Sequence, residues 1–269
     1  MKIPIIIFLV SMYFVSYAQE TAFLKKYSYL CFGLDNQNKK ISSGTCYFYK
    51  KGTSTILITN YHVVSGISSA NDSIINKQID TLYFTCDSNE MIVTQSVTVP
   101  KLNARHALFY EKTDLIGIGI PLSKGNSVNY INDLIDTSYL NKKPDSVYLY
   151  GYPTSQIKTD GKVISSFSQQ LVSGKYSDSF KFDFIPVFKT PNSKTSMSED
   201  EIITKLRNTE FTIDKKSYPG QSGSPIFGRF KVDKTWVYKF IGMLWGEGNK
   251  DFIYSMAYKG LVIYQNLNR

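Results

Sequence analysis

Short runs of β-branched and aromatic residues, separated by turn residues, recur along most of this chain and constrain its fold more than any other feature. Thr45–Lys50 and Thr55–Asn60 are two such runs, and Lys51-Gly52-Thr53-Ser54 between them is typical of a hairpin turn. Further strands are expected at residues 81–86, 91–99, 107–110, 115–120, 146–150, 162–171, 179–184, 225–230, 235–245 and 252–257. Many short strands with few helices predict an all-β fold, either a sandwich or a pair of barrels.

A polar stretch at residues 123–145, rich in Asn, Asp and Lys, divides these strands into two groups. We expect it to connect an N-terminal unit, residues 19–122, to a C-terminal unit, residues 146–269. Helices are expected at two places in the C-terminal unit. Ser198 and Glu201 form a capping box that starts one helix, and residues 258–267 are expected to form the other.

Residues 1–18 have the three-part layout of a secretory signal peptide. Lys2 provides a positive start, Ile5 to Val15 is almost wholly apolar, and Ser16 and Ala18 are small residues suited to a cut after Ala18. The alternative is an uncleaved membrane anchor, but the apolar run is shorter than the roughly 20 residues that span a bilayer. We therefore expect cleavage, a mature chain without a transmembrane segment, and a secreted or periplasmic location.

The three cysteines, Cys31, Cys46 and Cys86, leave at least one thiol unpaired. One disulfide is possible, and the sequence does not choose the pair. None of the three lies in a CxxC or at ligand spacing from a histidine, so no metal site and no cofactor are expected.

The formal net charge is +9, from 31 Lys and Arg against 22 Asp and Glu. A basic surface attracts nucleic acid and anionic lipid. The lysines are scattered in pairs, however, and no arginine-rich run occurs. A solvated basic surface is the better interpretation, so no specific nucleic-acid partner is expected, and the oligomeric state is left open.

Only two histidines, His62 and His106, are available as the base that a serine nucleophile usually needs at neutral pH. His62 directly follows an apolar run, so a rigid strand end would hold its ring. Both histidines precede Ser222, which lies in Pro219-Gly220-Gln221-Ser222-Gly223. The glycines permit a turn in which backbone amides point at a developing oxyanion.

Asp114 directly precedes the apolar segment 115–120. Buried beside His62, it would orient the ring and stabilise the imidazolium. Each residue also has a plain structural interpretation: His62 at an ordinary strand end, Asp114 in a turn, and Ser222 in a Gly/Ser/Pro turn before a strand. The combination in the order His, Asp, Ser favours a catalytic triad and excludes the α/β-hydrolase order, in which His comes last.

These segments resemble the chymotrypsin clan of serine peptidases, and within it the bacterial HtrA-like and V8-like (glutamyl endopeptidase-like) branches. Thr59-Asn60-Tyr61-His62-Val63-Val64 resembles TNxHVV, Asp114-Leu115-Ile116 resembles DLA, and residues 219–225 resemble PGNSGGP and GNSGSP. Residues 147–153 resemble the family's GYP strand, and residues 241–246 resemble the strand that lines the S1 pocket. The resemblance runs from about Ser43 to Trp245.

The resemblance implies two packed six-stranded Greek-key β-barrels with one or two short helices. It implies a serine endopeptidase that cleaves polypeptides through an acyl-enzyme. His62, Asp114 and Ser222 would form the triad, and the amides of Gly220 and Ser222 would form the oxyanion hole.

The substrate-binding residues implied by the same alignment are Trp245, Gly246 and Lys216. Lys216 lies six residues before the nucleophile, at the floor of the S1 pocket, where it would pair with an acidic P1 side chain. A solvent-facing Lys216 is the alternative.

Leu244 stands where many family members carry a Ser that supports the triad Asp. This departure motivates the alternative function, a weakly active or inactive binding module of the same fold at the cell envelope. No C-terminal PDZ domain is expected.

Overall fold

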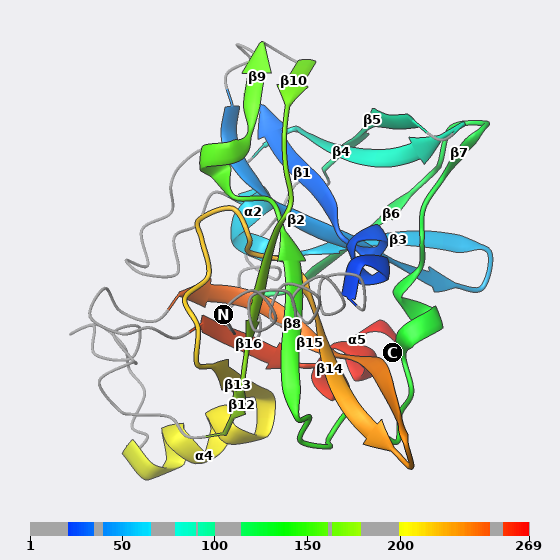
Figure 1. The fold of residues 1–269 in the computed structure, drawn as a ribbon. Coiled ribbons are helices and arrows are strands. Elements are labelled where there is room, and N and C mark those ends of the chain that lie inside the picture. Colours follow the sequence, from blue (N-terminus) through cyan, green and yellow to red (C-terminus); the bar gives the residue numbers. More distant parts are fainter. Residues whose placement is uncertain are drawn as a thin grey trace, which may run out of the picture.

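The computed structural model describes residues 21–34, 40–65, 79–89, 91–99, 114–160, 163–178, 199–247 and 255–268. Two curled antiparallel sheets make up most of this part of the chain, one in the upper and one in the lower half of Figure 1. The all-β expectation is therefore confirmed.

The first sheet has the strand order β5-β4-β1-β2-β3-β6, and β7 pairs with β4. Its strands are β1 (Tyr29–Leu34), β2 (Lys40–Lys51), β3 (Ser54–Thr59), β4 (Thr81–Ser88), β5 (Met91–Thr98), β6 (Ile116–Ile120) and β7 (Asn126–Ser127). The expected hairpin is β2–β3, and Gly52 in its turn has a φ of 58°, a value that glycine adopts without strain.

The second sheet has the order β11-β8-β14-β15-β16-β13-β12. Its strands are β8 (Ser146–Gly151), β11 (Gln170–Gly174), β12 (Tyr176–Ser177), β13 (Glu210–Ile213), β14 (Pro225–Val232), β15 (Thr235–Glu247) and β16 (Ser255–Lys259). A separate ribbon pairs β9 (Lys158–Asp160) with β10 (Val163–Ser166).

Helical segments are short and lie around the sheets. They are η1 (Phe23–Tyr27), α2 (Tyr61–Ser65), η2 (Ile131–Leu134), η3 (Thr154–Gln156), α4 (Glu199–Thr209) and α5 (Gly260–Leu267). Among the helices that the structure describes, none has the length and apolar character needed to cross a bilayer.

Each sheet encloses an apolar core, and a third cluster joins the two. The first core includes Cys31, Cys46 and Cys86, which are all buried free thiols rather than a disulfide. Aromatic residues dominate the joining cluster, where the Tyr47 ring of β2 lies 5.7 Å from the Phe240 ring of β15. This contact packs the two sheets against each other.

Several elements differ from expectation: β1 and β13 were not expected, and β2 begins at Lys40 rather than at Thr45. The strand expected at residues 162–171 is divided into β10 and β11, and the Gln169 side chain between them donates to the carbonyls of Lys25 and Ser28. The second helix begins at Gly260, because Tyr258 is paired in β16 with Met243 and Glu210. The strands expected at residues 107–110 and 179–184 lie outside the described residues.

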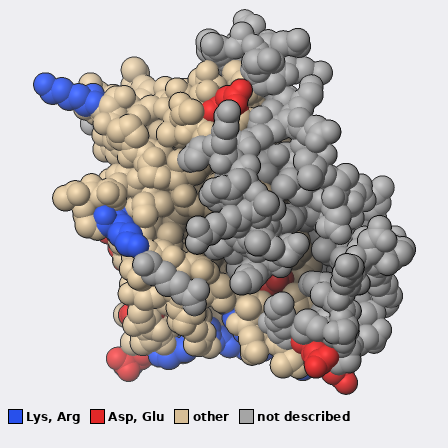
Figure 2. All heavy atoms as spheres, turned by 180° about the vertical axis from the view of Figure 1, so that it is seen from behind, with Lys and Arg blue, Asp and Glu red and all other residues tan. Residues whose placement is uncertain are grey.

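On the face shown in Figure 2, Lys and Arg side chains lie in several separate places, and acidic side chains lie both near the top and along the lower rim. This arrangement agrees with scattered surface charge on that face.

Candidate active site

His62 and Asp114 lie at the same end of a strand pair. Strands β3 and β6 are antiparallel neighbours with Thr59 opposite Ile116, so the residues after β3 meet those before β6. His62 Nδ1 lies 2.5 Å from Asp114 Oδ2, and the His62 amide donates to Asp114 Oδ1 at 2.9 Å. Asn60 Nδ2 donates to the Asp114 carbonyl at 2.7 Å, so the backbone of the aspartate is fixed as well.

The burial of this pair sets its electrostatics. Asp114 is only 3% exposed, and the His62 side chain is 24% exposed. Burial lowers the pKa of His62, but the charge of Asp114 and its hydrogen bond outweigh burial and raise this pKa above the ordinary value of 6.5. Because the carboxylate accepts at Nδ1, the neutral ring keeps its proton there and presents Nε2 as an acceptor.

Ser222 lies in a tight loop that needs both of its glycines. Gly220 and Gly223 have φ values of 94° and 88°, which residues with a side chain rarely adopt. A methyl group on Gly223 would lie 2.0 Å from the carbonyl oxygen of Thr45, and one on Gly220 would lie 2.6 Å from that of Tyr152. The loop therefore passes too close to neighbouring backbone for any other residue.

Strand β2 of the first sheet holds this loop. The amide of Thr45 donates to the carbonyl of Ser222 at 2.8 Å, and the Thr45 hydroxyl donates to the carbonyl of Gly220 at 3.1 Å. A methyl group on Gly44 would lie 2.8 Å from Val63 Cγ2 and 3.2 Å from the Ser222 carbonyl oxygen. The residue after His62 and the backbone of Ser222 thus pack on the same glycine.

Two amides of the loop differ from the others in their hydrogen bonding. Those of Gln221, Gly223 and Ser224 donate to backbone carbonyls, whereas no acceptor among the described residues is bonded to the amides of Gly220 and Ser222. These are the two amides that the sequence singled out.

The three substrate-binding candidates lie in different surroundings. Trp245 is partly exposed on β15, and its Nε1 donates to Glu210 Oε2 at 3.0 Å. A methyl group on Gly246 would meet nothing within 4 Å, so no described atom fills the space next to this residue. Lys216 is exposed beside the exposed Lys215, an environment that favours the solvent-facing alternative.

Sequence reasoning missed two residues next to the pair. The phenolic oxygen of Tyr258 accepts a hydrogen bond from the Asp114 amide at 2.8 Å, and the buried Glu210 interacts with Asp114 electrostatically. A charged residue at the start of an apolar run was the available signal for Glu210. Tyr258 carried none, because it was expected to begin a helix.

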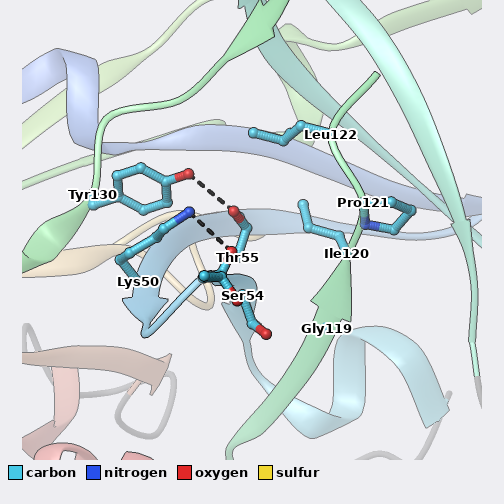
Figure 3. Close-up of a pocket in the computed structure, with 9 residues that line it drawn as sticks. Lys50, Ser54, Thr55, Gly119, Ile120, Pro121, Leu122 and Tyr130 are labelled. Atoms are coloured by element: carbon cyan, nitrogen blue, oxygen red, sulfur yellow. Dashed lines mark hydrogen bonds between the residues drawn. The ribbon is translucent and has the colours of Figure 1, made fainter. Parts of the chain in front are cut away.

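A pocket of about 510 Å³ lies elsewhere, between the β2–β3 hairpin, the end of β6 and Tyr130 (Figure 3). In it the Thr55 and Tyr130 hydroxyls are 2.9 Å apart. Thr55, the second residue of β3, lies opposite Ile120, so this pocket is at the other end of the strand pair from His62. Among the described residues, no group of three or more His, Cys, Asp or Glu side chains is placed to hold a metal ion.

Solved structures similar to this chain are serine proteases. The thermostable serine protease AL20 from an extremophilic microorganism aligns with a TM-score of 0.52 at 12% identity, over 91% of this chain and 96% of that chain. The mutant Rv3671c from M. tuberculosis H37Rv, in its inactive form, aligns with a TM-score of 0.51 at 12% identity, over 92% and 88% respectively. No family model and no curated protein matches the sequence. At this identity the likeness shows the fold: the chain has the two-barrel fold of trypsin-like serine proteases.

Proposed function

We propose that this protein is a secreted serine endopeptidase in which Ser222, His62 and Asp114 act as a catalytic triad. The observation that carries the proposal is the buried Asp114 carboxylate bonded to both the Nδ1 and the amide of His62. A histidine at an ordinary strand end has no need of a carboxylate held in this way. The glycine-dependent Ser222 loop and the likeness to serine proteases support the same function.

In the proposed reaction Ser222 Oγ attacks the carbonyl carbon of a peptide bond, and His62 Nε2 accepts the hydroxyl proton. The amides of Gly220 and Ser222 donate to the developing oxyanion. His62 then gives the proton to the leaving amine, which leaves an acyl-enzyme on Ser222. Water deacylates it by the same steps, with His62 again acting as base and then as acid.

Asp114 stabilises the imidazolium at both stages. Because His62 must be neutral to accept a proton, activity is expected to fall as pH drops through its raised pKa. The acidic limb of the kcat/KM profile should therefore lie above pH 6.5.

We propose Trp245 and Gly246 as contacts for the substrate on the N-terminal side of the cut bond, because they lie on β15 beyond Met243, where the pairing of β15 with β14 ends. Export with cleavage after Ala18 remains part of the proposal. It rests on the sequence, since residues 1–20 lie outside the described residues.

A fluorophosphonate probe and a peptide library test the proposal together. The probe should label the wild-type protein, and Ser222→Ala should abolish both labelling and cleavage. Ser224→Ala is the matched control, because its hydroxyl is buried and donates to the Gln221 carbonyl. It should still be labelled. A wild-type chain that neither reacts nor cleaves would contradict the proposal.

The second candidate is an inactive binding module of the same fold. Leu244 favours it, since a buried leucine, 1% exposed, offers no hydroxyl near the triad. Peptide binding without probe labelling would support this function instead.

A further inference from the structure

Asp114 forms hydrogen bonds with both halves of the molecule. Its carbonyl accepts from Asn60 and Tyr61, and its carboxylate accepts from His62, all of which follow β3 of the first sheet. Its amide, by contrast, donates to the phenolic oxygen of Tyr258 on β16 at 2.8 Å. This hydrogen bond ties the residue before β6 to the second sheet.

Both partners of this bond are buried, with Asp114 3% and Tyr258 6% exposed. Water is therefore poorly placed to replace the phenol, and a buried amide without an acceptor is unfavourable. Leu244 has only an apolar side chain, and its amide and carbonyl bond to Ser224 and Gly223. Within the described residues, Tyr258 is therefore the second-sheet side chain that bonds Asp114.

Tyr258 is itself held in place by its neighbours. Its ring stacks on Trp245 with centroids 5.9 Å apart and planes at 26°. Trp245 Nε1 donates to Glu210 Oε2 at 3.0 Å, and Glu210 lies directly opposite Tyr258 in the β13–β16 pair. The three side chains form a closed unit, because each is fixed by another as well as by its own strand.

We propose that Tyr258 is a positioning residue for the triad, held by Trp245 and Glu210, and that its hydroxyl keeps Asp114 where the carboxylate bonds the Nδ1 and the backbone amide of His62. The inference rests on the proposed function, since it assigns Tyr258 a part in the same triad. If the hydroxyl is lost, Asp114 moves more freely and its attraction for the His62 ring weakens.

Tyr258→Phe is the direct test, because it keeps the ring and its stacking and removes only the acceptor. We expect kcat to fall about tenfold with KM changed less than about twofold, the size of effect that one buried hydrogen bond carries. We also expect the pKa of His62 to fall by about 0.5, since its carboxylate partner is held less closely. Tyr148→Phe is the matched control: Tyr148 is fully buried in the same sheet and its hydroxyl bonds Ser146, so kcat and the pKa of His62 should not change.

The pKa of His62 is measurable without any activity. The chain has two histidines, so in a His106→Gln background an NMR pH titration reports His62 alone. Among the described residues, the ionisable groups other than His62 that interact with the Asp114 carboxylate are Tyr61 and Glu210, and burial raises the pKa of both. Since neither group is changed in Tyr258→Phe, a change in the His62 titration reports the loss of the hydroxyl.

Glu210 supplies a second pair of variants in case Tyr258→Phe folds poorly. Glu210→Gln keeps an acceptor for Trp245 Nε1–H and should leave the His62 titration as in wild type at neutral pH. Glu210→Leu removes the acceptor and should lower the pKa of His62 in the same direction as Tyr258→Phe. The inference is overturned if Tyr258→Phe matches Tyr148→Phe in both readouts, or if the two Glu210 variants titrate alike. An inert wild type would overturn the proposed function, whereas the His62 titration would still decide this inference.

Discussion

Glu210 makes the stability of this fold depend on pH in a direction opposite to that of most carboxylates. Burial is the main cause that raises its pKa from an ordinary 4.5 to about 8; the hydrogen bond from Trp245 opposes this and the charge of Asp114 adds to it. Between these two pH values the folded chain holds a proton that the unfolded chain has released. The free energy of unfolding should therefore decrease as pH rises through this window.

The magnitude follows from the difference between the two pKa values. Each pH unit in this window lowers the free energy of unfolding by about 1.4 kcal/mol. A carboxyl whose pKa is raised from 4.5 to about 8 therefore lowers it by roughly 4–5 kcal/mol in total. Glu210→Gln has nearly the shape of the neutral acid, keeps an acceptor for Trp245 and cannot ionise. The free energy of unfolding of Glu210→Gln minus that of wild type should therefore increase by an amount of this order from pH 5 to pH 8.5.

Urea denaturation followed by far-UV circular dichroism measures this difference. Both chains should carry Ser222→Ala, so that self-cleavage does not interfere. Contributions from all other groups cancel in the comparison, and any packing cost of the amide adds a constant that does not vary with pH. The reasoning is refuted if the Glu210→Gln difference is flat within about 1 kcal/mol across this range.

Four further outcomes are expected. Gly223→Ala should destabilise the fold by about 3 kcal/mol or more in urea, because its new methyl group would meet the Thr45 carbonyl at 2.0 Å and its φ is 88°. Leu244→Ser should lower the melting temperature, because the cavity and the buried hydroxyl that it creates together destabilise the fold by about 3 kcal/mol. Lys216→Ala should change the ratio of cleavage after P1 Glu and P1 Val by less than about twofold, as peptide kinetics would show for an exposed side chain. Intact mass of the exported protein should correspond to a chain that begins at Gln19; a mass that retains residues 1–18 would mean an anchor.

Local patterns were sufficient to predict the elements that carry the site. The hairpin around Gly52, the strand before His62 and the strand after Asp114 all follow from alternation and turn residues close in sequence. The two glycines of the Ser222 loop were predictable for the same reason, since φ near 90° is a local requirement.

Contacts between distant segments were not predictable in this way. Glu210 stands out in the sequence only as a charged residue at the start of an apolar run, and nothing around it indicates that Trp245 bonds it and that Tyr258 lies opposite it. Tyr258 was expected in a helix because residues 258–267 form one apolar segment, whereas pairing with β13 and β15 keeps it in β16. The Gln169 side chain, between β10 and β11, likewise bonds carbonyls of residues 25 and 28, more than a hundred positions away.

The hydrogen bonds between the sheets also have a consequence for the order of assembly. The bond between Asp114 and Tyr258 joins positions 144 residues apart, and the one between Thr45 and Gly220 spans 175 residues. Closing such long loops is slow, and a chain that is synthesised from its N-terminus completes the first sheet before β14–β16 exist. An emerging chain would therefore carry His62 and Asp114 with no nucleophile beside them. The proposed hydrolysis would begin only after the last strands have docked.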